Sequence, residues 1–176
     1  HAMTSYIINL LVLICVNATL AVTLNFIMGY AGIFSLAHAI FFGIGSYAAA
    51  YIALHFTGSL FVILPAAMLV AALVGLALAL PALRVRGEYF VAASLGLQVI
   101  GVTVFSEWKS VTGGIGGVMG FQPASLLGYT LESPTAYLVW SVVMLVRIVL
   151  AINTLLRSSF GRNVQAIRAS ESAALA

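Results

Sequence analysis

The side chains that could carry out acid, base or nucleophilic chemistry are few in this chain. Its acidic residues are four glutamates, Glu88, Glu107, Glu132 and Glu171. No two of them have the spacing of a catalytic carboxylate pair, and no Ser/His/Asp set or metal-ligand cluster accompanies them. The single cysteine, Cys15, has no second thiol or ligand nearby, so we predict that it packs in a helix. We therefore expect no enzymatic reaction, no metal and no cofactor in this chain.

A glycine-rich run, TGGIGG at residues 112–117, is not a phosphate loop, because no Lys-Ser/Thr pair follows the glycines. It lies in a long polar connection, residues 106–133, where we expect irregular backbone. The net charge of +3 is spread over few residues. Nucleic-acid binding needs a dense basic patch, so no nucleic-acid partner is predicted.

The remaining candidates are polar side chains inside apolar stretches. Asn17, Ala21 and Asn25 recur at i, i+4 and i+8, and this stripe is predicted to face other helices. For Asn25, helix packing and substrate contact both remain open. His38 is a functional candidate because histidine is rare inside membranes, although a satisfied structural hydrogen bond explains it equally well. Gln98 falls at mid-depth of another apolar run.

Small residues form a predicted contact face along the second helix, consisting of Ser35, Ala39, Gly43, Ser46 and Ala50. Such a face lets a neighbouring helix approach closely.

Arg147 is the one charge inside an apolar helix. It stands about ten residues before the inner end of its span, near the bilayer centre, so it should face protein or a wet cavity. A structural explanation is favoured over a transport role.

The elements that position these residues follow from composition. Apolar residues make up 63% of the chain and charged residues 6%, with a mean hydropathy of +1.17. In soluble domains, roughly 45–50% of the residues are apolar and about 25% are charged. We predict an all-α integral membrane protein with five spans: residues 6–27, a helix starting near Ile33, 60–83, 89–105 and 134–156. Residues 1–3 are interpreted as a cloning remnant, and residues 4–156 as the transmembrane domain.

The basic residues predict the orientation. Five of the seven, Arg84, Arg86, Arg157, Arg162 and Arg168, lie in two short segments. The positive-inside rule places both segments in the cytoplasm and the N-terminus outside.

Residues 157–176 are the only sustained polar segment. Read as a helix, it places Phe160, Val164 and Ile167 on one stripe, with Arg168 and Glu171 at the spacing of a surface ion pair. Resting on anionic lipid headgroups and docking on a cytoplasmic partner both remain open.

Four blocks of this sequence resemble one family. Residues 159–174, SFGRNVQAIRASESAA, are similar to the S-x-x-G-R-x-x-x-A-I-R-x-x-E-x-A-A loop of branched-chain amino acid ABC transporter permeases of the LivM type. Residues 25–47, NFIMGYAGIFSLAHAIFFGIGSY, resemble the N-L-x-x-G-Y-A-G-x-x-S-L-G-H-A-x-F-F-G-I-G-A-Y signature, with Ala37 where glycine is usual. Residues 84–90 and 112–117 resemble R-x-R-G-x-Y-F and T-G-G-x-x-G.

The resemblance implies a permease subunit of an ATP-driven importer for branched-chain or related amino acids in the plasma membrane of a bacterium or archaeon. It implies that ATP and Mg²⁺ bind to separate cytoplasmic ATP-binding subunits. Further partners would be a second homologous permease subunit, a periplasmic or extracellular substrate-binding protein and membrane lipid. Alternatives are the same importer family carrying urea or short-chain amides, and a non-transporting membrane scaffold.

Family resemblance also suggests site residues. In this family the polar loop docks on the ATPase, which makes residues 157–176 a coupling segment whose candidates are Gly161, Arg162, Ala166, Ile167, Arg168 and Glu171. Candidates for the substrate pathway are Asn25, Ser35, His38, Gly43 and Gln98. Because such permeases usually continue with further membrane helices, we expect this chain to be a C-terminally truncated form.

Overall fold

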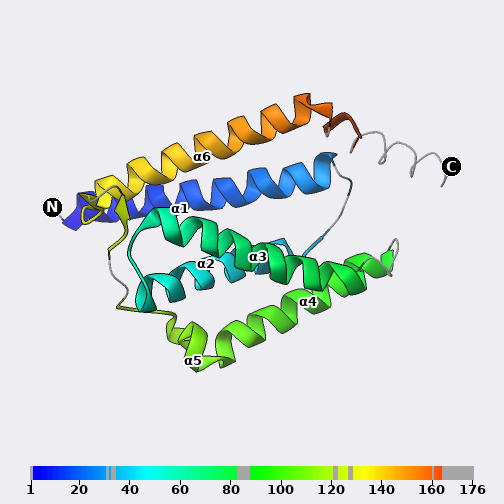
Figure 1. The fold of residues 1–176 in the computed structure, drawn as a ribbon, viewed down its shortest axis with the longest axis horizontal. Helices are drawn as coiled ribbons and strands as arrows, with labels where there is room; N and C mark the ends of the chain where they lie inside the picture. The colour runs from blue at the N-terminus through cyan, green and yellow to red at the C-terminus, as the bar shows by residue number, and fades with distance from the viewer. Residues whose placement is uncertain are drawn as a thin grey trace. The chain divides into compact units, whose positions relative to one another are not determined.

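The computed structural model describes residues 2–30, 32, 35–82, 88–120, 123–126, 129–159 and 161–163 (Figure 1). Helices dominate, as predicted. The longer elements are α1 (Ala2–Asn25), the π-helix η1 (Phe26–Tyr30), α2 (His38–His55), α3 (Leu60–Ala82), α4 (Glu88–Glu107) and α6 (Pro134–Arg157). Short elements join α4 to α6: α5 (Lys109–Thr112), the 3-10 helix η2 (Gly114–Gly116), β1 (Ser125–Leu126) and β2 (Tyr129–Thr130).

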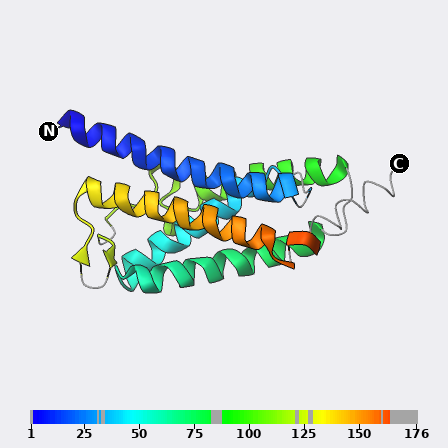
Figure 2. The same ribbon diagram turned by 90° about the horizontal axis from the view of Figure 1, so that it is seen from above.

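The chain divides into two compact units, residues 1–34 with 133–176, and residues 35–132. In the first unit, α1 and α6 lie side by side and run in the same direction (Figures 1 and 2). Two residues define the start of α6. Pro134 has no backbone N–H that would need a partner, and the Ser133 hydroxyl accepts a hydrogen bond from Ala136 N at 3.2 Å. α1 continues without a break into η1.

The parallel arrangement of α1 and α6 decides whether the number of membrane crossings between them is odd or even. A membrane chain reverses direction at each crossing, so two parallel spans are separated by an odd number of others. Among the described residues, four helices are long and apolar enough to cross a membrane: Met3–Tyr30, Leu60–Leu78, Tyr89–Glu107 and Pro134–Arg157. α2 is not among them, but its 18 residues extend about 27 Å, close to the bilayer core. Counting α2 as a span gives the predicted five.

The boundaries predicted from hydropathy are close to those observed, with one correction. The second helix begins at His38 and not near Ile33, which lies outside the described residues. Residues 35–37 form a turn before it. The other predicted ends differ by one or two residues, except at the N-terminus, where α1 already begins at Ala2.

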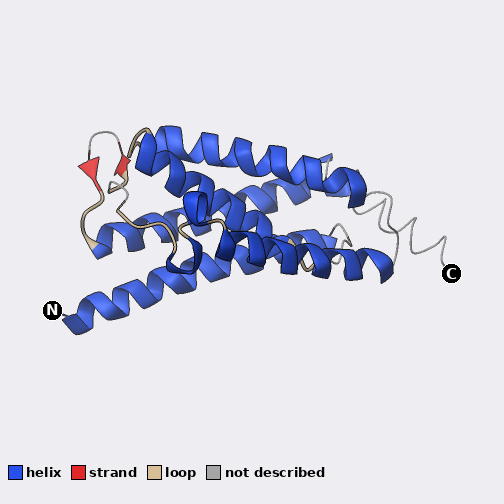
Figure 3. Cartoon of the chain, turned by 90° about the horizontal axis from the view of Figure 1, so that it is seen from below, coloured by secondary structure: helices blue, strands red, loops and turns tan. Residues whose placement is uncertain are grey.

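In the second unit, α2 and α3 pack antiparallel, with Phe41 against Gly75 and Ala71 against Gly45. α4 crosses α2 on another side. The buried apolar side chains belong to the turn before α2, to α2 and to the first part of α3: Ala37, Ile40, Ala53, Leu60, Ile63 and Ala67. The small hairpin β1–β2, red in Figure 3, pairs Ser125 with Thr130. It is tied to the α2–α3 turn by Ser125 N donating to Gly58 O at 2.7 Å.

Candidate functional site

The segment predicted to couple to an ATPase begins directly after α6. Residues 159 and 161–163 are helical, and Gly161 is buried. A Cβ added at Gly161 would lie 2.5 Å from Leu156 O, 2.6 Å from Leu156 Cα and 2.7 Å from Leu155 O. The absence of a side chain at Gly161 therefore serves a close approach within the chain, to the last turn of α6.

Arg162 is exposed, but its guanidinium is bonded to its own chain. Nη1 donates to Arg157 O at 3.1 Å and Nη2 donates to Ser159 Oγ at 3.0 Å. The carbonyls of the last helical turn lack partners within the helix, and a cation near them is favourable. Ser158 closes the same turn, since its N–H donates to Leu155 O at 3.1 Å.

The other predicted coupling residues, Ala166, Ile167, Arg168 and Glu171, lie outside the described residues. The same holds for Phe160, Val164 and the expected ion pair between Arg168 and Glu171.

Two predicted substrate-pathway residues, Gly43 of α2 and Gln98 of α4, lie on the stripes along which these two helices pack. A Cβ on Gly43 would lie 2.5 Å from Phe105 Cε2, and Tyr47 packs against the same ring with centroids 4.9 Å apart. Gly101 faces Ile40 so closely that a Cβ there would overlap the isoleucine side chain. Gln98 lies on this stripe of α4, one turn before Gly101. Its Oε1 is buried and accepts no hydrogen bond within the described structure.

Ser94 extends the same stripe and was not singled out by sequence reasoning. It is 6% exposed, accepts a bond from Leu36 N at 3.0 Å and donates to Val91 O at 2.8 Å. The turn before α2 has no side-chain cap of its own, because Ala37 occupies the N-cap position. Ser94 satisfies the backbone N–H of Leu36 in the turn before α2, although the two residues are 58 positions apart in sequence.

Ser35 and His38 lie at the start of α2, and both are half-buried. His38 is the first residue of the helix and has an interaction partner within the chain. The small-residue face predicted along α2 is only partly used for packing. Ala39 and Ser46 are exposed, and the Ser46 hydroxyl donates to Gly43 O of its own helix at 2.9 Å. The close contacts instead run through Ile40, Phe41, Gly43 and Gly45.

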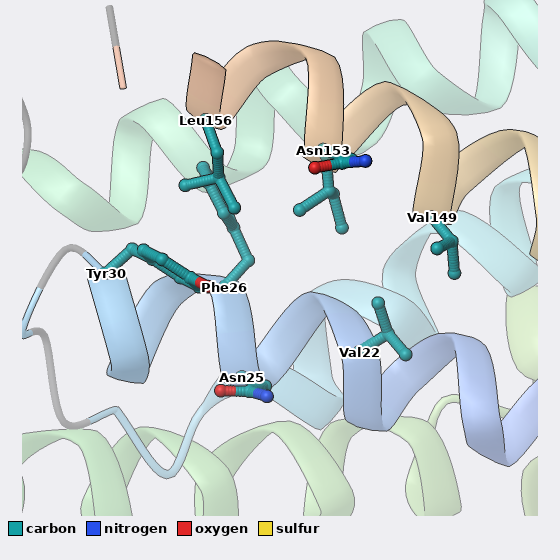
Figure 4. Close-up of a pocket in the computed structure, with 8 residues that line it drawn as sticks. Val22, Asn25, Phe26, Tyr30, Val149, Asn153 and Leu156 are labelled. Carbon is teal, nitrogen blue, oxygen red and sulfur yellow. The ribbon is translucent and has the colours of Figure 1, made fainter. Parts of the chain in front are cut away.

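Asn25 belongs to the other unit and lines a pocket of about 190 Å³ between α1 and α6 (Figure 4). The lining combines apolar side chains with two amides and a phenol: Val22, Asn25, Phe26, Tyr30, Val149, Ile152, Asn153 and Leu156. Asn25 ends α1 at the junction with the π-helix, an irregularity that is frequent at functional sites. The sequence analysis did not recognise η1, because a π-helix has no simple hydropathy signature. It did not single out Asn153 either.

The predicted stripe of Asn17, Ala21 and Asn25 is exposed along its length. Asn17 is satisfied within α1, where Nδ2 donates to Leu13 O at 2.8 Å. No described helix of this chain covers Asn17 or Ala21, so the prediction that this stripe faces other helices stays a prediction.

The glycine-rich run forms a tight turn after α4. Thr112 is 2% exposed. Its hydroxyl lies 2.7 Å from Phe105 O and 2.8 Å from Trp108 O, and it can donate its proton to either carbonyl. Gly113 has φ of 75°, and a Cβ there would overlap the Gly117 carbonyl. Glycine is therefore required at position 113, where it caps the C-terminus of α5, and the Thr112 hydroxyl satisfies the Phe105 carbonyl near the end of α4.

Arg147 is exposed near the middle of α6. It precedes Val149 by two residues, which places it about 200° around the helix from this pocket residue. Arg147 thus lies on the side of α6 turned away from α1.

Comparison with known proteins gives one family. The sequence profile described as "Branched-chain amino acid transport system / permease component" matches residues 6–176. The permease protein LivM of the high-affinity branched-chain amino acid transport system of Salmonella typhimurium is 29% identical over 175 residues, covering 86% of this chain and 41% of the relative. The protein of the same name from Escherichia coli is 27% identical over 187 residues, covering 93% of this chain and 44% of the relative. The chain thus spans about two fifths of the length of these relatives. No solved structure gave a significant match.

Proposed function

This chain belongs to the permease-component family of branched-chain amino acid transport systems, and on that premise we propose that it is the membrane subunit of an ATP-driven importer of branched-chain or related amino acids. The profile match carries the proposal, because it extends from α1 through the whole polar segment after α6. The apolar helices support a multi-pass protein of the inner membrane.

The importer we propose needs partners, because this sequence contains no phosphate loop of the kind that binds ATP. They are cytoplasmic ATP-binding subunits that hold ATP and Mg²⁺, a second homologous permease subunit and a substrate-binding protein outside the membrane. The names of the two relatives support a multi-component system, because each is described as the permease protein of a transport system.

Coupling is assigned to residues 157–176 in this proposal. Ala166 and Ile167 would enter a groove on the ATP-binding subunit, while Arg168 and Glu171 would set the orientation at the rim. Apolar anchors should supply most of the affinity, because exposed ion pairs contribute only about 0–1 kcal/mol each.

The substrate pathway is proposed to include the α2–α4 contact. Gln98 is the best candidate there, because its buried, unpartnered Oε1 can accept a hydrogen bond from the ammonium group of an amino acid. Asn25, with its amide at the α1–α6 pocket, and the α2 residues Ser35, His38 and Gly43 complete the set.

Reconstitution of a full-length permease carrying this sequence tests the function. The protein is assembled with its ATP-binding subunits and binding protein in proteoliposomes, and ATP hydrolysis and uptake are measured with leucine, isoleucine, valine and urea. Leucine-stimulated hydrolysis with leucine uptake supports the proposal. Stimulation by urea alone identifies an amide importer, and a stable complex without stimulation identifies a scaffold.

A further inference from the structure

We propose that Ser158, Ser159, Gly161 and Arg162 form a rigid elbow after α6, in which Gly161 and Arg162 hold the chain against the end of α6 and do not themselves bind the ATPase. Both residues are then positioning residues that act through α6. The consequence for transport depends on the proposed function, whereas the rigidity of the elbow does not.

Gly161 provides the first observation. The three atoms that a Cβ would meet, at 2.5, 2.6 and 2.7 Å, are all backbone atoms of Leu155 and Leu156. Flexible side-chain ends can rotate away from a new methyl group, but helix backbone cannot move without distorting the helix. Among the described residues of its unit, Gly161 is the only buried one. It therefore has no surface to offer a partner, and any larger residue must separate the segment from α6.

Hydrogen bonds across the turn provide the second observation. The Arg162 guanidinium connects to Arg157 O on the helix and to Ser159 Oγ in the turn. The Arg162 backbone N–H donates to Ser158 O at 3.3 Å, and the Ser158 hydroxyl donates to Leu155 O at 2.5 Å. These bonds connect residues on both sides of the bend. The two bonds of the Arg162 guanidinium therefore join the residues after α6 to the carbonyl end of the helix.

The mechanical consequence follows from the length of α6. Its 24 residues extend about 36 Å, enough to cross the bilayer. A force applied to the coupling segment tilts such a helix only if the joint between them is stiff. A loose joint would absorb the displacement in the turn, leaving the ATPase bound but without effect on α6.

Rigidity is tested on the chain itself in nanodiscs, without any partner. Cys15 is replaced by serine, spin labels are placed at Val146 and Asn163, which are both exposed, and the distance distribution is measured by double electron–electron resonance. We expect a narrow distribution that becomes shifted or broadened in Gly161→Ala. The matched control is Gly96→Ala, because a Cβ at Gly96 meets nothing within 4 Å. An unchanged narrow distribution in Gly161→Ala overturns the elbow.

Arg162→Met provides a second variant that adds no steric clash. It removes the donors but keeps an apolar stem, and Arg157→Met is its control, with the same loss of charge from an exposed side chain. We expect broadening in Arg162→Met and a distribution like that of the parent in Arg157→Met. Equal distributions in the two variants contradict a role for the guanidinium fork.

The functional arm uses the full-length importer. We expect Gly161→Ala to leave the affinity for the ATP-binding subunit unchanged while uptake per ATP hydrolysed falls several-fold. A loss of affinity that accounts for the loss of uptake shows that Gly161 is a docking residue and overturns the proposal. If the parent protein transports nothing, the proposed function fails, while the distance measurements still decide whether the elbow is rigid.

Discussion

Residues 35–132 contain the buried core of the described chain, whereas α1 and α6 bury no residue at all. The number of helices that pack together in each unit accounts for much of this difference. α2 meets α4 through Gly43 and Gly101, and it meets α3 through Gly45 and Gly75. α1 and α6 contain no glycine and still lie close together along their length, but each has only the other long helix to pack against within its unit. Small residues are what allow close packing of membrane helices, because lipid offers no hydrophobic drive for association.

The two regions therefore teach different things about function. The second unit buries a small core of its own, and within it the buried Gln98 Oε1 accepts no hydrogen bond from the described residues. The α1–α6 pair leaves broad apolar surfaces to lipid or another subunit. Gly161, which is buried, lies just after α6, where the chain enters the proposed coupling segment.

The largest expected effect is an all-or-none difference in cysteine labelling, which tests whether α2 crosses the membrane. Single cysteines replace Tyr30, Phe56 and Lys109 in a Cys15→Ser background, each exposed in the structure. With α1 entering from outside, we expect an impermeant maleimide to label positions 56 and 109 from outside and position 30 only from the cytoplasm. Labelling of positions 30 and 56 from the same side would contradict the crossing by α2.

Arg147 tests the exposed surface of the α1–α6 pair. An arginine at the helix centre costs about 2.5–3.5 kcal/mol on insertion scales, so Arg147→Leu should lower the apparent insertion free energy of residues 134–157 by at least that amount. A translocon glycosylation assay measures it, with Leu145 and Leu150 replaced by alanine to prevent saturation. Arg157→Leu, at the helix end, is the control and should change insertion little. Equal shifts in the two variants would mean that Arg147 does not reside at mid-depth.

Gly101 tests the packed core of the other region. In Gly101→Leu the new side chain meets the buried Ile40 across the α2–α4 contact, and overpacking of this kind costs about 1–3 kcal/mol. We expect a lower thermal midpoint in detergent, whereas Gly96→Leu, on an open face of the same helix, should stay near the parent. Because leucine favours a helix more than glycine does, a midpoint lowered equally by both variants would contradict tight packing at Gly101 as the cause.

The sequence by itself determined the class of protein, the places of its long apolar helices and most of their ends. Each span is a local property, since a run of some twenty apolar residues must form a helix to satisfy its backbone in lipid. The blocks that identify the family are local as well, which is why the profile match agrees with motifs read from the printed sequence. The start of α2 was misplaced because the residues before His38 are as apolar as the helix itself.

Only the tertiary structure decided which polar and small residues meet. Several small-residue stripes run along α2, and hydropathy could not show that Gly43 and Gly45 make contacts while Ala39 and Ser46 remain exposed. Ser94 reaches Leu36 across 58 residues, a pairing that no local pattern contains. The close approach at Gly161 depends in the same way on where the chain turns after α6, because a glycine in a sequence indicates freedom of conformation but not which atoms will fill the space beside it.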